Sequence, residues 1–225
     1  PAFLVAEQRR VAELWPSVEV TIETVHEGAS PALIDRSGSY TMTVVGARGL
    51  SVGSRLALGS VSGHVSAHAS GISVLVRPRT PGIGRPVVAG IDSAEHAGAL
   101  LHVAGREALL RKTRLVVFHA WEMPPADPYG SWVLTHDIPT GLADDARALV
   151  VEAVAKVHAD MPDLETEVLV QRGHPVAVTL GLAHTAELLV LGRHGRGWFE
   201  GMLTGSVAAA ARHSSDCPVM VVPVR

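Results

Sequence analysis

Short apolar runs alternate with longer amphipathic segments along most of this chain, and that alternation predicts an α/β fold. An apolar run of about four to eight residues that ends at a turn residue is typical of a buried strand, whereas apolar residues at helical spacing predict a helix. After a stretch dense in Pro, Gly and Arg (77–86), the pattern is regular. It predicts strands at 87–92, 113–121, 164–173, 187–192 and 217–224. It predicts helices at 97–112, 141–160 and 174–184, and another that starts at Ser206. Such an alternation implies a parallel sheet with helices on both faces.

The chain before residue 77 carries the same pattern in an incomplete form. The pattern there predicts a helix end at 2–15, a strand at 18–28, a short helix, a strand at 41–46, a helix after Gly59 and a strand at 71–79. Counterparts of the strands at 87–92 and 113–121 are missing, although both belong near the middle of such a sheet. One retained strand then loses its neighbours and the core is left open. We expect that residues upstream are absent from this sequence; the alternative is that another chain supplies the strands.

A glycine pattern, G-x2-G-x9-G-S-V, occurs twice in the chain at an offset of 146 residues, each time after an apolar run. The first copy comprises Gly46, Gly49, Gly59, Ser60 and Val61. The second copy comprises Gly192, Gly195, Gly205, Ser206 and Val207. Two matches in register indicate an internal repeat of one domain type.

This glycine pattern suits a loop that binds phosphate. Glycine at a strand end permits positive φ and leaves room for a ligand, and successive N–H groups in such a turn form a concave anion site. Ser206 can cap the following helix, whose start favours negative charge, and its hydroxyl can donate to a phosphate oxygen. The pattern is neither a Walker loop nor the dinucleotide fingerprint, because the spacings of those motifs are absent. The alternative is a flexible turn without a ligand.

Residues that can carry chemistry gather where several predicted strands end. Asp92, His119 with Ala120, and Gly192 all fall at the same edge of the predicted sheet. Ligands of open α/β sheets bind at the carboxyl ends of the strands, at the point where the strand order reverses. The plainer alternatives are that Asp92 caps the next helix and that His119 is a packed core residue.

Other candidate residues have equally plain interpretations. Arg193 and Arg196 suit phosphate groups, since arginine forks bind them, but solvated loop arginines are equally favoured. His64 and His68 stand one helical turn apart, yet no further metal-binding motif accompanies them, so no metal site is predicted. Cys217 precedes a buried strand and is expected in the core rather than as a nucleophile.

Composition and charge narrow the classes of function. The chain has 225 residues, 47% of them hydrophobic, which predicts a sizeable core in one large or two small domains. A net charge of −3 does not indicate a nucleic-acid-binding protein, which would need a basic surface. A single cysteine excludes an internal disulfide framework. The sequence shows no apolar run of about 18 residues and no signal-peptide pattern, so we expect a cytoplasmic protein without a membrane span. It shows neither a general base that would orient a water nor a pair of acidic metal ligands, so no catalytic residue is predicted.

These residues resemble the universal stress protein family in its tandem-domain form. The matching segments are 87–92 (VVAGID), 118–121 (FHAW), 189–207 (LVLGRHGRGWFEGMLTGSV), 217–223 (CPVMVVP), 44–61 and 74–78. The resemblance implies a doubly wound, five-stranded parallel sheet of order 3-2-1-4-5, a Rossmann-like fold of the adenine nucleotide alpha hydrolase type. It also implies two domains in tandem. Residues 1–78 would form the C-terminal part of the first domain, 79–85 a linker and 86–225 a complete second domain.

The resemblance to the nucleotide-binding branch implies the ligand contacts. Asp92, with Gly90 in the same strand, would contact the adenosine portion of ATP, and the backbone at Ala120 would meet adenine. The loop would be shaped by Gly192 and Gly195, with Arg193 and Arg196 beside it, and the phosphates would be bound by Gly205, Ser206 and Val207. The first unit would use Gly46, Gly49, Gly59, Ser60 and Val61, but no counterpart of Asp92 exists there. The family commonly has Gly-Ser after the aspartate, whereas this chain has Ser93-Ala94, a departure at the turn.

The function implied by the resemblance is that of an ATP-binding stress-response regulator, or nucleotide-dependent switch, with weak or no hydrolysis. ATP is the expected ligand, and Mg²⁺ is left open as its companion ion. The expected partners are the adenine nucleotide, a homodimer or an intramolecular pseudo-dimer formed through the fifth strands, and an unidentified regulatory protein. The alternatives are an interaction module that binds no nucleotide and a slow ATPase. An adenylyl transferase ranks last because its pyrophosphate motifs are absent.

Overall fold

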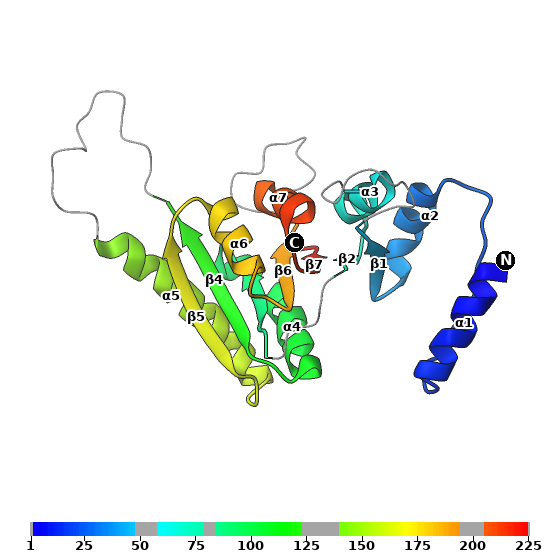
Figure 1. Ribbon diagram of the computed structural model, residues 1–225. Coiled ribbons are helices and arrows are strands. Elements are labelled where there is room, and N and C mark those ends of the chain that lie inside the picture. Colours follow the sequence, from blue (N-terminus) through cyan, green and yellow to red (C-terminus); the bar gives the residue numbers. More distant parts are fainter. Residues whose placement is uncertain (1, 48–57, 79–83, 123–139, 194–204, 225) are drawn as a thin grey trace, which may run out of the picture.

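A mostly parallel seven-stranded sheet runs through the molecule, with helices on its faces (Figure 1). The computed structural model describes residues 2–47, 58–78, 84–122, 140–193 and 205–224. The strands are β1 (Met42–Gly46), β2 (Ile72–Val76), β3 (Val87–Gly90), β4 (Leu115–Trp121), β5 (Thr166–Arg172), β6 (Leu188–Gly192) and β7 (Val219–Val222). The helices are α1 (Ala2–Leu14), α2 (Ala29–Arg36), a short 3-10 turn (Ser37–Ser39), α3 (Ser60–His68), α4 (Ala94–Arg111), α5 (Thr140–Asp160), α6 (Pro175–Ala183) and α7 (Ser206–Ser214). We call residues 2–78 the first unit and residues 84–224 the second unit.

The second unit has the doubly wound fold that the resemblance implied. Its strands lie in the order β5-β4-β3-β6-β7, which is 3-2-1-4-5 when they are counted along this unit, and all four pairings are parallel. Every strand and helix predicted after residue 86 forms, with ends displaced by a few residues. Side chains alternate between the two faces of each strand, so the sheet has one apolar core on each face. Val87 and Ala89 face α4 and α5, whereas Val88 lies with the residues packed under α6 and α7.

The two units join through their last strands, which pair antiparallel. The register places Ser73 opposite Val221, Val74 opposite Met220, and Leu75 opposite Val219. Val74 and Met220 are 146 residues apart, so they occupy the same position of the repeat and face each other across a local two-fold axis. The intramolecular pairing of fifth strands is therefore present. A homodimer and the domain boundaries at 78 and 86 remain predictions.

From the first unit's described residues, β1 and β2 are the strands that enter the sheet, with α2 and α3 beside them (Figure 1). The strand predicted at 18–28 is wrong, because residues 19–25 have no regular secondary structure. The pattern of side chains there suits a strand, but a strand also needs a neighbour that satisfies its backbone groups. In the order 3-2-1-4-5 that neighbour is the second strand, and no strand in the described part of this unit corresponds to it.

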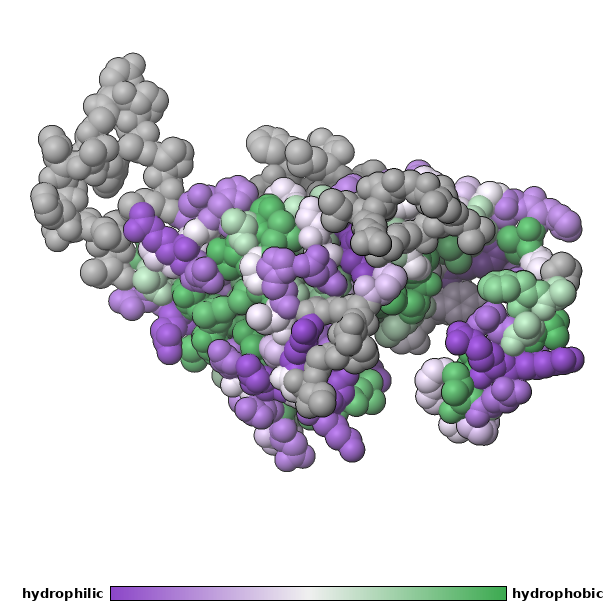
Figure 2. All heavy atoms as spheres, in the orientation of Figure 1, coloured by the Kyte–Doolittle hydropathy of each residue, from purple (hydrophilic) through white to green (hydrophobic). Residues whose placement is uncertain are grey.

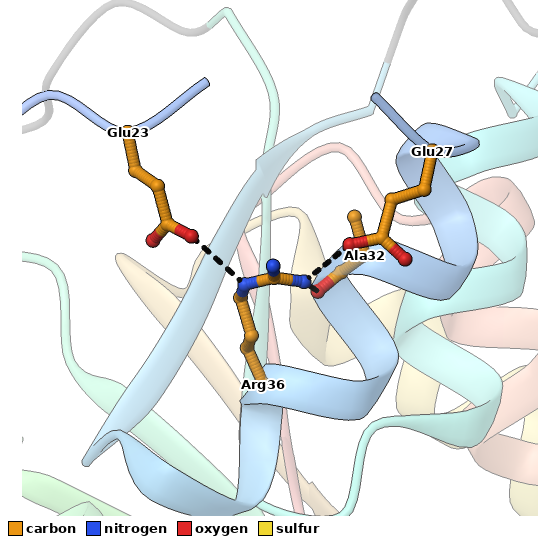
Figure 3. A network of polar contacts seen from close by, with 4 residues as sticks. All are labelled: Glu23, Glu27, Ala32 and Arg36. Atoms are coloured by element: carbon orange, nitrogen blue, oxygen red, sulfur yellow. Dashed lines mark hydrogen bonds and ion pairs between the residues drawn. The ribbon is translucent and has the colours of Figure 1, made fainter. Parts of the chain in front are cut away.

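Ion pairs at the surface, and not the hydrogen bonds of a sheet, hold the segment before α2. Arg36 Nε lies 3.3 Å from Glu23 Oε1, and Arg36 Nη1 lies 2.6 Å from Glu27 Oε1 and 3.0 Å from the Ala32 carbonyl oxygen (Figure 3). The hydrogen bond to Glu27 raises the pKa of the exposed Arg36 guanidinium. Exposed ion pairs stabilise proteins only weakly, so this segment is held less firmly than a strand in a ladder.

Helix α1 stands away from the sheet, and none of its residues is buried (Figure 1). Gln8 Nε2 donates to the Val20 carbonyl oxygen at 2.6 Å, which ties α1 to the irregular segment after it. Among the described residues, no helix is both long and apolar enough to cross a membrane.

Candidate functional site

The carboxyl ends of β3, β4 and β6 meet at one edge of the sheet. Gly90 is level with Phe118 of β4 and with Leu191 of β6, and the Ile91 amide donates to the Phe118 carbonyl at 3.0 Å. This register brings Asp92, Ala120 and Gly192 to the same edge, as the sequence predicted. The edge is also the switch point, because the chain leaves β3 on one side for β4 and later returns on the other side as β6.

The backbone of Arg193 holds the two ends of the second unit's glycine segment together. The Arg193 amide donates to the Val222 carbonyl at 2.9 Å, and the Arg193 carbonyl accepts from the Gly205 amide, also at 2.9 Å. The chain therefore leaves the end of β6 at residue 193 and returns beside it at Gly205, where α7 begins. The start of α7 consequently lies next to the edge that carries Asp92.

The expectation that Ser206 caps α7 is wrong. The N-cap is Gly205, with φ −57° and ψ 144°, and Ser206 is the first helical residue. No side chain caps this helix or α3, whose N-cap is Gly59. Glycine is a common N-cap residue, but it has no side chain that could accept a hydrogen bond from the helix. The first N–H groups of α7 therefore have no partner within the helix and none from a cap. Such a helix start retains the donors that an anion requires.

The first unit repeats this geometry atom for atom at the same offset of 146 residues. The Ala47 amide donates to the Val76 carbonyl at 2.8 Å, and the Ala47 carbonyl accepts from the Gly59 amide at 2.9 Å. Ser62 Oγ also donates to the Ala47 carbonyl at 3.2 Å. The internal repeat inferred from the glycine pattern is thus present in the hydrogen bonds, and both glycine segments are closed in the same way.

A sequence profile of the universal stress protein family matches residues 2–78 and 84–223, nearly the whole chain. The chain belongs to the universal stress protein family. A universal stress protein of Mycobacterium tuberculosis (strain H37Rv) is 33% identical over 240 residues, covering 99% of this chain and 75% of the relative. A universal stress protein of Mycolicibacterium smegmatis is 36% identical over 213 residues, covering 92% and 69%.

Two solved structures of this family share the fold. A crystal structure of a universal stress protein from Archaeoglobus fulgidus has a TM-score of 0.61 and 18% identity, covering 99% of this chain and 79% of the other. A structure from Pseudomonas aeruginosa, named for the same family, has a TM-score of 0.69 and 16% identity, covering 99% and 78%. At these identities the likeness shows the architecture of the universal stress proteins and nothing finer.

Asp92 does not cap α4, although a capping role was the plainer alternative to a ligand role. The N-cap is Ser93, whose Oγ accepts from the His96 amide at 3.4 Å and lies 3.0 Å from His96 Nδ1. Asp92 is half-buried in the turn just before this cap. The serine directly after Asp92 therefore does the capping.

His119 braces the turn that carries Asp92. Its Nδ1 lies 2.9 Å from the Ile91 carbonyl oxygen, and because a carbonyl only accepts, Nδ1 carries the proton. His119 therefore has a defined structural contact from β4 to the residue next to Asp92.

Gly90 has a packing reason to be glycine. A Cβ atom there would lie 2.7 Å from Phe118 Cζ and 2.9 Å from Leu191 Cδ2, closer than real Cβ contacts. The side chains of the two neighbouring strands thus close over Gly90 on this face. Its contact with a ligand remains a prediction.

Arg193 reaches across to the first unit. Its Nη2 donates to the Gly71 carbonyl at 3.3 Å, and burial lowers the pKa of its guanidinium. Arg212 of α7 is 4% exposed, and its pKa is lowered by burial and then by the positive charge of Arg193. Arg77 of the first unit donates in turn to the carbonyls of Arg212 and His213 at the end of α7.

The sequence analysis did not predict these contacts between the units; it considered Arg193 only as a phosphate ligand or as a solvated loop residue. The available signal was a lone arginine, Arg212, within an alanine-rich helix. Gly49, Gly195 and Arg196 lie outside the described residues.

Other candidates behave as core or surface residues. Cys217 is buried, and burial raises the pKa of its thiol, so the expected core role is confirmed. The rings of His64 and His68 lie 4.4 Å apart, but within the described parts of the chain no cluster of three or more His, Cys, Asp or Glu side chains could hold a metal ion.

Proposed function

We propose that the chain is an ATP-binding stress-response protein whose complete nucleotide site is the carboxyl edge of the second unit. The observation that carries this proposal is the hydrogen bond from the Gly205 amide to the Arg193 carbonyl. It sets the uncapped start of α7 beside the edge where Asp92 and Ala120 lie. A carboxylate for the ribose hydroxyls and a helix start for phosphates then stand on one edge, as a nucleotide requires.

Each predicted residue has a distinct part in this proposal. Asp92 accepts hydrogen bonds from the ribose, and the backbone at Ala120 meets the base. Phosphate oxygens accept from the amides of Ser206 and Val207 at the start of α7 and from the Ser206 hydroxyl. Gly192 and Arg193 begin the segment between β6 and α7, and Arg193 is turned partly toward the first unit. We include Gly195 and Arg196, farther along the same segment, in the proposed site. Mg²⁺, where present, would arrive with the phosphates.

The first unit holds only the phosphate half of such a site. Gly59, Ser60 and Val61 repeat the geometry at the start of α3, and Gly46 ends β1 beside them. The described residues of this unit include no strand that would carry the counterpart of Asp92. We therefore assign one nucleotide site to this chain. Bound ATP acts as a ligand that shifts conformation or partner affinity, and hydrolysis is not needed for that role.

Calorimetric titration with ATP tests the site through Asp92→Ala. Loss of the ribose contact should weaken binding at least about tenfold, or about 1.4 kcal/mol. Asp163→Ala is the matched control, because Asp163 is an exposed carboxylate in the turn before β5, at the opposite edge of the sheet. Equal affinity of folded Asp92→Ala and wild type would refute the site. Phosphate release over many turnovers, compared between these variants, separates a ligand role from a slow ATPase.

The cellular part of the proposal is a cytoplasmic regulator that acts through a protein partner, alone or as a homodimer. The sheet itself supports only the intramolecular pairing of the two units. Sedimentation with and without ATP tests the homodimer, and cell fractionation tests the location. A nucleotide-dependent change in co-purified proteins would identify the partner.

A further inference from the structure

Two arginine side chains of the second unit lie deep in the region where the two units meet. Arg212 of α7 is 4% exposed, and Arg193 is half-buried just after β6. Figure 2 shows hydrophilic residues spread over the surface of the molecule, where charged side chains usually lie, so an arginine as deep as Arg212 is unusual. Burial lowers the pKa of Arg212, and the positive charge of Arg193 lowers it further. The two guanidinium groups are therefore close enough to repel each other.

The first unit builds the same elements without a charge at either position. The residues 146 positions earlier are Ala47 and Ser66, which are 1% and 2% exposed. Ser66 Oγ donates to the Gly63 carbonyl at 3.2 Å, and Ala47 makes the same closing backbone hydrogen bonds as Arg193. Folding of the repeat therefore does not require a guanidinium group at these two positions. This comparison favours a ligand role for the arginines.

A buried hydroxyl lies on the same side of the sheet. Ser73 of β2 is 1% exposed and lies opposite Val221 of β7. Side chains two residues apart on a strand share a face, so Ser73 lies on the face of Leu75, which packs in the core under α7. Its Oγ atom has no hydrogen-bond partner among the described residues. The counterpart of Ser73 in the repeat is Val219, so an apolar side chain fits this position, and a buried hydroxyl there costs stability unless something accepts its proton.

Arg193 links these groups across the junction of the two units. Its Nη2 donates to the carbonyl of Gly71, two residues before Ser73, at 3.3 Å. Its Nε atom is buried and has no hydrogen-bond partner in the described structure. Within the described parts of the chain, no carboxylate forms an ion pair with Arg193. A guanidinium group can only donate and a hydroxyl can donate, so an anion is the ligand that would accept from all of these groups.

We propose that Arg193, Arg212 and Ser73 form an anion site between the two units, the seam site, which binds a phosphate group. Guanidinium forks match pairs of phosphate oxygens, and the serine hydroxyl donates to a further oxygen. A phosphate group carries about two negative charges at neutral pH, which balances the two arginines. The bound group would also give the Nε atom of Arg193 and the Oγ atom of Ser73 an acceptor.

The seam site differs from the proposed nucleotide site in its elements. Arg212 belongs to the last turn of α7, whereas the nucleotide site uses the first turn. Ser73 belongs to the first unit, and Arg77 of the same unit donates to the Arg212 and His213 carbonyls, which holds the last turn of α7 against it. Arg193 is the residue that the two sites share. Because the seam site draws on both units, a bound phosphate group should tighten the pairing of β2 with β7.

Calorimetric titration of the nucleotide-free chain with inorganic phosphate, at constant ionic strength, tests the seam site. We expect one phosphate per chain and slower hydrogen exchange of the β2 amides when phosphate is bound. Arg212→Ser and Arg193→Ala copy the residues of the first unit and should each weaken phosphate binding at least about tenfold. Arg106→Ser, at an exposed arginine of α4, is the matched control and should leave it unchanged. No saturable binding to the wild type, or equal affinity of the wild type and both folded seam variants, would overturn the proposal.

Ser73→Ala separates a ligand role from a packing role. In the absence of phosphate this variant should have a higher Tm than the wild type, because it removes a buried hydroxyl without an acceptor. Phosphate should then raise the Tm less than it does in the wild type, since one donor to the anion is gone. Ser66→Ala removes a hydroxyl that is bonded to Gly63 and should leave the effect of phosphate unchanged. Comparing variants also cancels the general stabilisation that phosphate salts give to proteins. An equal rise in Tm for Ser73→Ala and the wild type would contradict the seam site.

The same phosphate titration at saturating ATP identifies the source of the phosphate group. If phosphate binds with unchanged affinity beside ATP, the seam site takes a separate anion. If ATP displaces phosphate and Arg212→Ser also weakens ATP binding, the seam site holds a phosphate group of the nucleotide. A chain that binds phosphate but no ATP would refute the proposed function and keep the seam site. A chain that binds ATP but no phosphate, with equal ATP affinity in Arg212→Ser, would refute the seam site alone.

Discussion

At the scale of single residues, each structural contact in the turn after β3 is made by a different residue. Gly90 admits the side chains of Phe118 and Leu191, Ser93 caps α4, and His119 holds the Ile91 carbonyl. Because each structural task has its own residue, Asp92 is not needed for capping. Capping of α4 by Ser93 therefore leaves the ligand role of Asp92 as a prediction.

Gly90→Ala should destabilise the protein, because its Cβ would overlap two well-packed side chains from neighbouring strands. Overpacking of this kind costs about 1–3 kcal/mol. Gly98→Ala is the matched control, since a Cβ at Gly98 in α4 meets nothing within 4 Å. It should be neutral or stabilise by up to about 1 kcal/mol, because alanine favours the helix. Urea unfolding of both variants decides the matter, and a stable Gly90→Ala protein would contradict the packing argument.

Cys217 should react slowly with thiol reagents in the native protein. Burial raises the pKa of its thiol, so at pH 8 less of it is thiolate than for an exposed cysteine, and the buried sulfur is also hard to reach. We expect native labelling to be at least about tenfold slower than labelling in urea. Similar rates with a colorimetric disulfide reagent in both states would show that Cys217 is exposed in solution.

At the scale of elements, the alternation of apolar and polar residues was sufficient for the second unit and insufficient for the first. Every strand and helix predicted after residue 86 forms, because each finds the neighbour that the pattern assumes. The same kind of pattern failed at 18–28, since side-chain alternation describes which faces a strand prefers and not whether a partner strand exists. Sequence alone also could not choose between Asp92 and Ser93 as the cap, because both residue types suit that position.

The cross-unit contacts were beyond the sequence for a different reason. Arg77 reaches the end of α7, and Arg193 reaches Gly71, only because β2 and β7 pair antiparallel. Residues more than a hundred positions apart are brought together by that one pairing. The edge with Asp92, Ala120 and Gly192 was predictable, by contrast, because the carboxyl ends of parallel strands must meet.

The repeat allows one substitution to be compared in two environments. Val190→Glu would bury an unpaired carboxylate in the core of β6 and should cost at least about 3 kcal/mol or prevent folding. Val44→Glu places the same group at the equivalent position of β1, which is 56% exposed, and should change stability by no more than about 0.5 kcal/mol. Urea unfolding monitored by circular dichroism measures both. Equal costs would mean that β1 is covered in solution.

At the scale of the whole molecule, two glycine segments are closed by matching hydrogen bonds, from Gly59 to Ala47 and from Gly205 to Arg193. Among the described residues, only the second segment lies beside a strand that is followed by an aspartate, Asp92. Released nucleotide, identified by mass spectrometry after denaturation, should therefore approach one ATP per chain. Two nucleotides per chain would show that the phosphate half-site binds without an aspartate. None, with no binding of added ATP, would favour an interaction module in which the repeated glycine segments serve only as turns.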